Sequence, residues 1–306
     1  MPLIPTPDVD EKLDSLYDLV ADEENARSCR DLDDSACRWV PRNFFVYLFS
    51  QTLTSLGDAL SSPKTVLTWV MATVGAPAAL IGLLVPIRES GSMLPQLALG
   101  AWVRRHPLRK PIWMAGSAVQ GLSVMGCAAA ALLLQGRSAG IMILVCVAVF
   151  SLARSLNSIA SKDIVGKTIP KGRRGRLGGW ASGLSGLLTL AVGLGFTMLN
   201  TESQGPELFA ALLLAAGMLW FVAILIFAAL QEFPGETAGG INGWQAAWRS
   251  LGLVRTDPAF GKFVLTRALL LCSALTAPYY VVLARENGAS GAATLGVFMI
   301  AGGLAS

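Results

Sequence analysis

The sequence predicts an all-α, polytopic membrane protein, and three observations support this prediction. Of the 306 residues, 53% are hydrophobic and only 14% are charged, and the mean hydropathy is +0.56. Soluble globular domains carry about 25% charged residues, so this composition indicates a protein that folds in lipid. The apolar residues are also gathered into long stretches, each near the roughly 20 residues that a bilayer-spanning helix needs.

Seven stretches are long and apolar enough to be predicted as transmembrane helices. They cover residues 43–72, 77–102, 111–135, 140–160, 178–200, 207–230 and 259–284. An eighth stretch begins near Gly291 and is still apolar at Ser306, so we expect the chain to belong to a longer protein.

This pattern divides the chain into four parts. We expect an acidic cytoplasmic tail (1–42), a six-helix bundle (43–230), a polar linker (231–258), and the first helix and partial second helix of another bundle (259–306). Trp244, Trp248 and Leu251 recur in the linker at helical spacing. They predict either a short amphipathic helix on the membrane surface or a loop with two interfacial tryptophans.

Basic side chains are unevenly distributed between the predicted loops. Loops 104–110 and 162–176 together contain ten Lys and Arg residues, whereas the loops on the opposite side contain only two. Membrane proteins keep such basic loops in the cytoplasm. The sequence therefore predicts a multi-pass protein of the plasma (bacterial inner) membrane with a cytoplasmic N-terminus. The lipid bilayer is the expected surrounding of the chain, and no nucleic-acid partner is predicted.

Enzyme activity is not predicted from this sequence. Its one histidine, His106, lies in a basic loop, and we find no nucleophile–base set, metal-ligand spacing or phosphate-binding loop. The five cysteines have no CxxC spacing, and Cys29 and Cys37 in the tail are expected to be free thiols. We therefore expect neither a cofactor nor a bound metal.

Charged residues inside predicted membrane helices are the main functional candidates, because a charge in hydrocarbon must face a cavity or a partner. The first predicted helix has a polar stripe within about 80° of its circumference. The stripe consists of Tyr47, Gln51, Thr54, Asp58, Ser61 and Thr65. It predicts the lining of a cavity, or alternatively a hydrogen-bonded interface between helices. Pro63 is expected to kink this helix.

The second predicted helix carries Arg88 and Glu89, at depths close to those of two charges on the first helix. Along ideal helices the depths of Asp58, Arg88 and Lys64 differ by no more than about 9 Å. We therefore predict two intramembrane ion pairs, Asp58–Arg88 and Lys64–Glu89. These pairs either fix helix packing, or include a carboxylate that binds a proton or a charge of the substrate.

Three further features lie on the later helices. Arg154 on the fourth helix is predicted either to face the cavity or to extend to the inner headgroups. Gln120 on the third helix is an isolated amide, suited to a hydrogen bond between helices or to a ligand. On the fifth helix, Gly179-x-x-x-Gly183 is a pattern that permits close helix packing.

The loop after the second helix carries a basic motif. It has the sequence Gly100-Ala-Trp-Val-Arg104-Arg105-His106-Pro107-Leu108-Arg109-Lys110. This segment resembles the G-x-x-x-D-R-x-G-R-R/K motif of the major facilitator superfamily, with Arg104 in place of the acid. The acid of the family forms part of a cytoplasmic charge latch, and Asp163 is the residue here that could replace it as a partner.

Two other segments and a weak repeat also resemble this family. Arg154-Ser-Leu-Asn157-Ser158 is similar to its R-x-x-Q-G motif, which implies a coupling role for Arg154. Arg174-Gly175-Arg176 is similar to the turn that precedes its fifth helix. The turns that begin at Gly75 and Gly288 match with one inserted residue, which is the period expected of two parallel six-helix halves.

The resemblance implies a secondary transporter of a small solute, coupled to protons, that works by alternating access between two rocking halves. Helices one, two, four and seven would line its cavity. A cavity with charges of both signs suits a polar or zwitterionic solute. The alternative function is a membrane-embedded sensor or assembly partner without transport. For such a protein, the buried charges would be needed only for folding.

Overall fold

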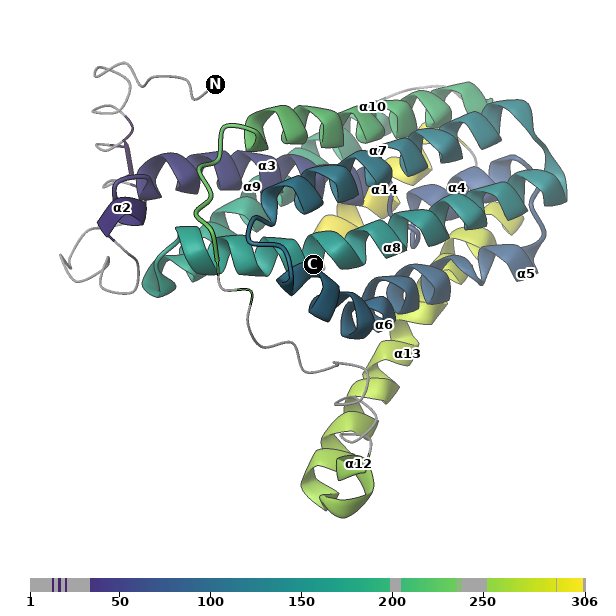
Figure 1. Ribbon diagram of the computed structural model, residues 1–306. Coiled ribbons are helices and arrows are strands. Elements are labelled where there is room, and N and C mark those ends of the chain that lie inside the picture. Colours follow the sequence, from purple (N-terminus) through teal and green to yellow (C-terminus); the bar gives the residue numbers. More distant parts are fainter. Residues whose placement is uncertain are drawn as a thin grey trace.

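The computed structural model describes residues 34–198, 205–235, 252–289 and 291–304, together with Leu13, Leu16, Tyr17, Val20 and Thr237. This part of the chain folds into helices and contains no strand (Figure 1). The longer helices are α3 (Val40–Leu60), α6 (Leu84–Arg104), α7 (Lys110–Leu133), α8 (Gly136–Thr168), α9 (Lys171–Thr197), α10 (Pro206–Phe227), α13 (Pro258–Glu286) and α14 (Gly291–Leu304). The shorter ones are α2 (Asp34–Cys37), α4 (Val66–Thr73), α5 (Ala78–Ile81) and α12 (Leu253–Thr256).

Five of the helices in the described ranges are long and apolar enough to cross a membrane, namely α7, α8, α9, α10 and α13. This composition indicates a helical membrane protein with several spans, as the sequence predicts. Helices α3 and α6 are each 21 residues long but are not among these five candidates. Helix α3 carries the polar stripe, and α6 includes Arg88, Glu89 and Arg104, which lower its hydropathy.

The first predicted helix, residues 43–72, is divided into α3 and α4 by a break at residues 61–65. Pro63 lies in this break and has no backbone N–H to donate, so a continuous helix would lose a hydrogen bond there. Nearby hydroxyl groups bond to the main chain instead. Ser61 Oγ donates to the Gly57 carbonyl at 2.8 Å, and Thr68 Oγ1 donates to the Pro63 carbonyl at 2.7 Å. The sequence predicts a kink at Pro63 within one helix, whereas the structure divides the segment into two helices there.

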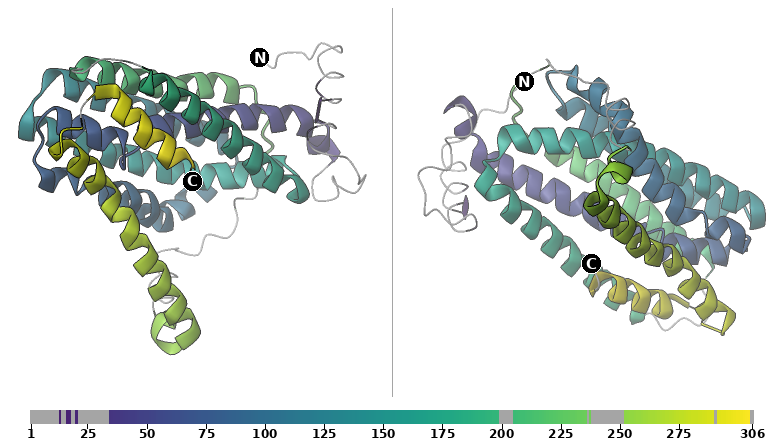
Figure 2. Two further views of the ribbon diagram at one scale, coloured as in Figure 1. Left: turned by 180° about the vertical axis from the view of Figure 1, so that it is seen from behind. Right: turned by 90° about the horizontal axis from the view of Figure 1, so that it is seen from below.

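The long helices form a bundle in which chain neighbours are not always packing neighbours. Helix α7 packs along α8 and α10, α6 packs along α8, and α3 packs against both α9 and α10. Helix α14 lies on α9, while α12 and the N-terminal part of α13 extend away from the bundle (Figures 1 and 2). The other end of α13 is attached to the bundle, since Arg285 Nη1 donates to Thr73 Oγ1 at 2.6 Å.

Glycines allow the closest helix contacts in the bundle. A Cβ atom at Gly57 of α3 would lie only 2.6 Å from the Trp220 ring of α10. Gly121 of α7 and Gly217 of α10 face each other, and a Cβ on either would lie 2.9–3.0 Å from the carbonyl oxygen of the other. Real Cβ atoms essentially never approach other atoms this closely, so α3, α7 and α10 need glycine at these positions.

The close packing that the Gly179 and Gly183 spacing permits is not made by the described residues. A Cβ atom at either position of α9 would meet nothing within 4 Å among the described residues. The close contact of α9 lies further along, where Gly193 faces Gly296 of α14. The spacing of small residues allows a close approach, but the partner helix decides where that approach occurs.

Two predictions for the polar segments have different outcomes. Cys37 is disulfide-bonded, so the prediction that it is a free thiol is wrong. That prediction was based on the expected compartment and not on the distance between cysteines, which a sequence does not give. The predicted amphipathic helix around Trp244 and Trp248 lies outside the described residues.

The contact between Gly57 and Trp220 gives a first testable prediction. The Gly57→Ala substitution should destabilise the protein by about 1–3 kcal/mol, because the new methyl group overlaps the indole ring. The matched control is Gly183→Ala, where the space is open and alanine should be neutral or stabilising by up to about 1 kcal/mol. Thermal unfolding in detergent measures both variants. Equal melting temperatures for the two would contradict the close α3–α10 contact.

Candidate functional site

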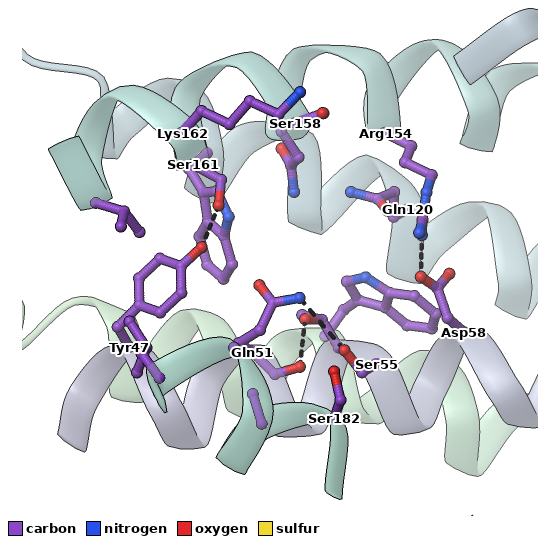
Figure 3. A pocket seen from close by; sticks show the side chains of 18 of the residues that line it. Tyr47, Gln51, Ser55, Asp58, Gln120, Arg154, Ser158, Ser161, Lys162 and Ser182 are labelled. Atoms are coloured by element: carbon purple, nitrogen blue, oxygen red, sulfur yellow. Dashed lines mark hydrogen bonds and ion pairs between the residues drawn. The ribbon is translucent and has the colours of Figure 1, made fainter. Parts of the chain in front are cut away.

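A cavity of about 530 Å³ lies inside the bundle, bordered by α3, α7, α8, α9 and α10 (Figure 3). Four members of the predicted polar stripe line it, namely Tyr47, Gln51, Thr54 and Asp58. The other two, Ser61 and Thr65, lie in the break after α3 and do not reach it. The structure therefore places the stripe at a cavity as far as α3 continues.

The carboxylate of Asp58 lies between two arginine side chains. Its Oδ1 atom accepts a hydrogen bond from Arg88 Nη2 of α6 at 2.6 Å, and its Oδ2 atom accepts one from Arg154 Nη1 of α8. This is the predicted Asp58–Arg88 pair with a second partner added. Each oxygen binds a different helix, so one carboxylate connects α3, α6 and α8. We refer to these three residues as the Asp58 triad.

The two arginines of the triad have different surroundings. The Arg88 side chain is only 12% exposed, and its guanidinium lies 3.8 Å from the centre of the Phe150 ring. Such a cation–π contact stabilises a buried guanidinium. The Arg154 side chain is 42% exposed and lines the cavity (Figure 3). Arg88 therefore supports Asp58 from within the protein, whereas Arg154 is accessible to a molecule in the cavity.

The second predicted pair, Lys64–Glu89, is absent from the ion pairs of the described residues, and neither side chain lines the cavity. The depth of Lys64 was calculated along a straight helix. Because α3 ends at Leu60, Lys64 instead lies in the break, away from its helical position. The prediction that Lys64 and Glu89 are cavity residues is therefore wrong.

Amide side chains join α7 to α8 at the wall of the cavity. The Asn157 amide fits its surroundings when its oxygen faces Ser117 Oγ and Gln120 Nε2, both at 2.7 Å, and its nitrogen faces the Trp113 carbonyl at 3.1 Å. Gly116 makes room for it, since a Cβ there would lie 2.0 Å from the Asn157 side chain. Gln120 and Asn157 both line the cavity and present amide groups to it.

Two further cations line the cavity, on the side away from the triad. Lys162 follows Arg154 and Ser158 at four-residue spacing on α8, so all three lie on one face (Figure 3). Arg174 of α9 also lines it, and donates to the carbonyls of Ile169 at 3.0 Å and Gly166 at 2.9 Å. Lys162 was predicted only as part of the basic loop 162–176, although its spacing from Arg154 signals a shared helix face.

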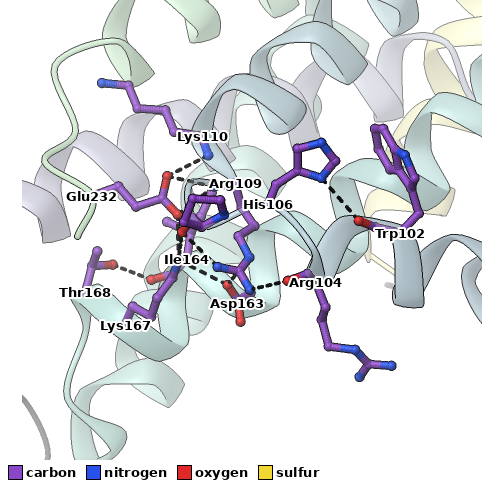
Figure 4. A network of polar contacts seen from close by, with 11 residues as sticks. Trp102, Arg104, His106, Arg109, Lys110, Asp163, Ile164, Lys167, Thr168 and Glu232 are labelled. Carbon is purple, nitrogen blue, oxygen red and sulfur yellow. Dashed lines mark hydrogen bonds and ion pairs between the residues drawn. The ribbon is translucent and has the colours of Figure 1, made fainter. Parts of the chain in front are cut away.

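A second group of charges lies at one end of the bundle, where the α6–α7 loop meets the end of α8 and the segment after α10 (Figure 4). Arg109 Nε is 2.9 Å from Asp163 Oδ2, which is the partner that the sequence suggested. Lys167 Nζ lies 3.2 Å from the same oxygen and 2.7 Å from Glu232 Oε1. We call Arg109, Asp163, Lys167 and Glu232 the end network.

Glu232 binds the first turn of α7 and was not predicted. Its carboxylate accepts hydrogen bonds from the Arg109 backbone N–H at 2.8 and 3.0 Å and from that of Lys110 at 2.7 Å. These N–H groups have no partners within their own helix, so the carboxylate caps the helix and complements its dipole. The Glu232 side chain is 1% exposed. The segment after α10 is thereby fixed to the start of α7.

The remaining motif residues contribute less to this end network. Arg104 provides only its carbonyl oxygen, which accepts from Arg109 Nη2 at 3.3 Å. Lys110 Nζ donates to the carbonyls of Ala228 and Leu230, at 2.6 and 2.8 Å. A Cβ atom at Gly100 would meet none of the described residues within 4 Å, and Arg105 and Arg176 are exposed.

Comparison with known proteins leaves the family open, because no protein-family model, curated protein or solved structure matches this chain. Within the described ranges, no group of three or more His, Cys, Asp or Glu side chains is arranged to hold a metal ion. The function is therefore argued from the cavity, the Asp58 triad and the end network.

The buried position of Glu232 gives a second prediction. Glu232→Gln should destabilise the protein by about 2–3 kcal/mol, because the amide loses the ion pair with Lys167 and cannot accept the α7 N–H bonds with both oxygens. The control is Glu286→Gln, at the exposed end of α13. Chemical or thermal unfolding in detergent compares the two variants. A Glu232→Gln protein as stable as the control would contradict the capping role.

Proposed function

We propose that this protein is a secondary transporter of the major facilitator type, which moves a small solute across the plasma (bacterial inner) membrane by alternating access, coupled to protons. The observation that carries the proposal is a polar, partly charged cavity among helices suited to a membrane. Its volume of about 530 Å³ is in the usual range for small-molecule sites, about 300–1,000 Å³. Burying charge at such a place is costly, so intramembrane charges commonly mark a transport path.

The two resembling motifs support the family proposal through their geometry. In the basic loop motif, Arg109 pairs with Asp163 at 2.9 Å, which supports a charge latch despite the missing family acid. In the other motif, Arg154 and Asn157 both line the cavity. With the basic loops in the cytoplasm, as charge distribution predicts, the end network would be the cytoplasmic latch.

The internal repeat also has a backbone counterpart. Gly75 follows α4 with φ +74°, and Gly288 follows α13 with φ +87°. Left-handed glycines of this kind end helices, and here each ends the first helical unit of one predicted half. Two matching turns at the same point of each half are the feature expected of parallel repeats.

Proton coupling is assigned to Asp58 within this proposal. It is the only acidic residue of the described chain that lines the cavity. A proton on its carboxylate would remove the charge that holds Arg88 and Arg154, and so would weaken the connection of α3 to α6 and α8. Uptake and release of one proton would thereby alter the packing of helices that rock during alternating access. Glu89 lies outside the cavity and has no such role.

The test is solute-driven proton flux in proteoliposomes, with a panel of amino acids, sugars, organic acids and cationic drugs. Asp58→Asn should lower the flux roughly tenfold or more, which corresponds to a lost interaction of about 1.4 kcal/mol. Glu89→Gln is the matched control and should keep wild-type flux, because it lies outside the cavity.

A folded Asp58→Asn protein with wild-type flux would contradict the coupling role. A wild-type protein that moves no proton with any solute, but whose triad variants lose stability, would favour the alternative of a membrane-embedded sensor or assembly partner. Thermal unfolding of each variant separates loss of folding from loss of transport.

A further inference from the structure

The charge of the cavity is unbalanced. Among the described residues that line it, three are cations (Arg154, Lys162 and Arg174) and one is an acid (Asp58). The acid is already satisfied, because each of its oxygens accepts a hydrogen bond from a guanidinium. Counting Arg88 behind it, the triad itself carries an excess of one positive charge. The mixed-charge lining predicted from the sequence is therefore electropositive in three dimensions.

Lys162 and Arg174 add to this excess, and no acid among the described residues forms an ion pair with either of them. Arg174 uses two of its nitrogens on carbonyls at the end of α8, which fixes its position at the cavity wall. The Arg154 side chain is bonded to Asp58 but is still 42% exposed. Three cations from α8 and α9 thus border the same cavity.

Neutral polar groups occupy much of the rest of the lining. Gln51, Ser55, Ser158 and Ser182 offer hydroxyl and amide donors toward the same space (Figure 3). Arginine and lysine with additional neutral donors are the groups that bind carboxylate and phosphate in proteins. A cationic solute would meet the three positive charges directly, and a zwitterion would leave its ammonium group without a free acid.

We propose that the solute of this cavity is a small organic anion, whose carboxylate or phosphate groups are bound by the lining cations Arg154, Lys162 and Arg174. This inference builds on the proposed function, because it names the class of solute for that site. The anion competes with Asp58 for the exposed guanidinium of Arg154. Binding of the solute and release of Asp58 are then linked events, and a freed Asp58 carboxylate is the group that accepts the proton.

The experiment measures the charge of the cavity directly and does not depend on knowing the solute. A cysteine introduced by Ser182→Cys is reacted with an anionic and a cationic methanethiosulfonate, MTSES and MTSET. The MTSES rate is divided by the MTSET rate. This ratio is then divided by the corresponding ratio for reaction of the two reagents with 2-mercaptoethanol, a neutral thiol, which corrects for their intrinsic reactivities. Mass spectrometry of the peptide that holds residue 182 follows this site alone, so the native cysteines remain in place.

The normalised ratio should favour the anionic reagent by roughly tenfold or more, since an electropositive cleft concentrates anions. Adding Lys162→Gln should lower it several-fold. Adding Arg137→Gln, at the exposed far end of α8, should leave it unchanged. A ratio that favours the cationic reagent, or one that Lys162→Gln does not change, would overturn the inference.

Protection of the same cysteine identifies the occupant. Citrate or inorganic phosphate should slow labelling by MTSET as well as by MTSES, which distinguishes occupancy of the cavity from screening of its charge. Glycine betaine and tetraethylammonium at equal ionic strength should not slow it. Protection by either of these two, or by neither anion, would overturn the inference. Protection that needs phosphatidylglycerol vesicles and fails with soluble anions would identify a lipid headgroup instead, and would also overturn it.

Failure of the anion proposal can be distinguished from failure of the transport proposal. Suppose that anions protect the cysteine at position 182 but the protein shows no solute-driven flux. This result would contradict the proposed transport and support an anion-binding cavity without transport. Flux driven by a cationic or zwitterionic solute, without protection by anions, would support the transporter proposal and contradict the proposal of an anionic solute.

Discussion

The carboxylate of Asp58, shared between two guanidinium groups, is the constraint on which the middle of this bundle depends. An ionised group withdrawn from water costs several kcal/mol unless its partners replace the lost hydration. Asp58 finds these partners on two other helices, Arg88 on α6 and Arg154 on α8. Helices α3, α6 and α8 must therefore stay within reach of one another, and the cavity opens beside the place where they meet.

The balance of positive and negative side chains differs between the end network and the cavity. In the end network, basic side chains are opposed by Asp163 and the buried Glu232, and the backbone of α7 shares the same carboxylate. That cluster is well balanced and ties the chain after α10 to the bundle. Around the cavity, Asp58 is the one acid among the described lining residues, against three cations on α8 and α9. Opposite charges that balance suit a fixed connection between segments, as in the end network. An excess of positive charge around a cavity suits the binding of an anion.

Sequence reasoning located the parts of this site that depend on regular helix geometry. The Asp58–Arg88 pair and the part of the polar stripe up to Asp58 follow from spacing and depth, because α3 remains helical as far as Leu60. Lys64 lies beyond that point, in the break at Pro63, where a depth counted along a straight helix no longer applies. A kink at Pro63 was predicted, but the division into two helices and its effect on the charges that follow were not.

What the sequence could not give is the choice of partner between distant segments. Glu232 lies more than 120 residues from the helix that it caps, and no local pattern signals the contact. In the same way, close packing of α9 occurs at Gly193 and not at the expected glycine pair, because it depends on where α14 lies. The most direct test of the Asp58 triad is a double-mutant cycle of Asp58→Asn and Arg154→Gln on unfolding free energy. The account predicts a coupling of about 1–3 kcal/mol between the two residues, whereas additivity within about 0.5 kcal/mol would contradict it.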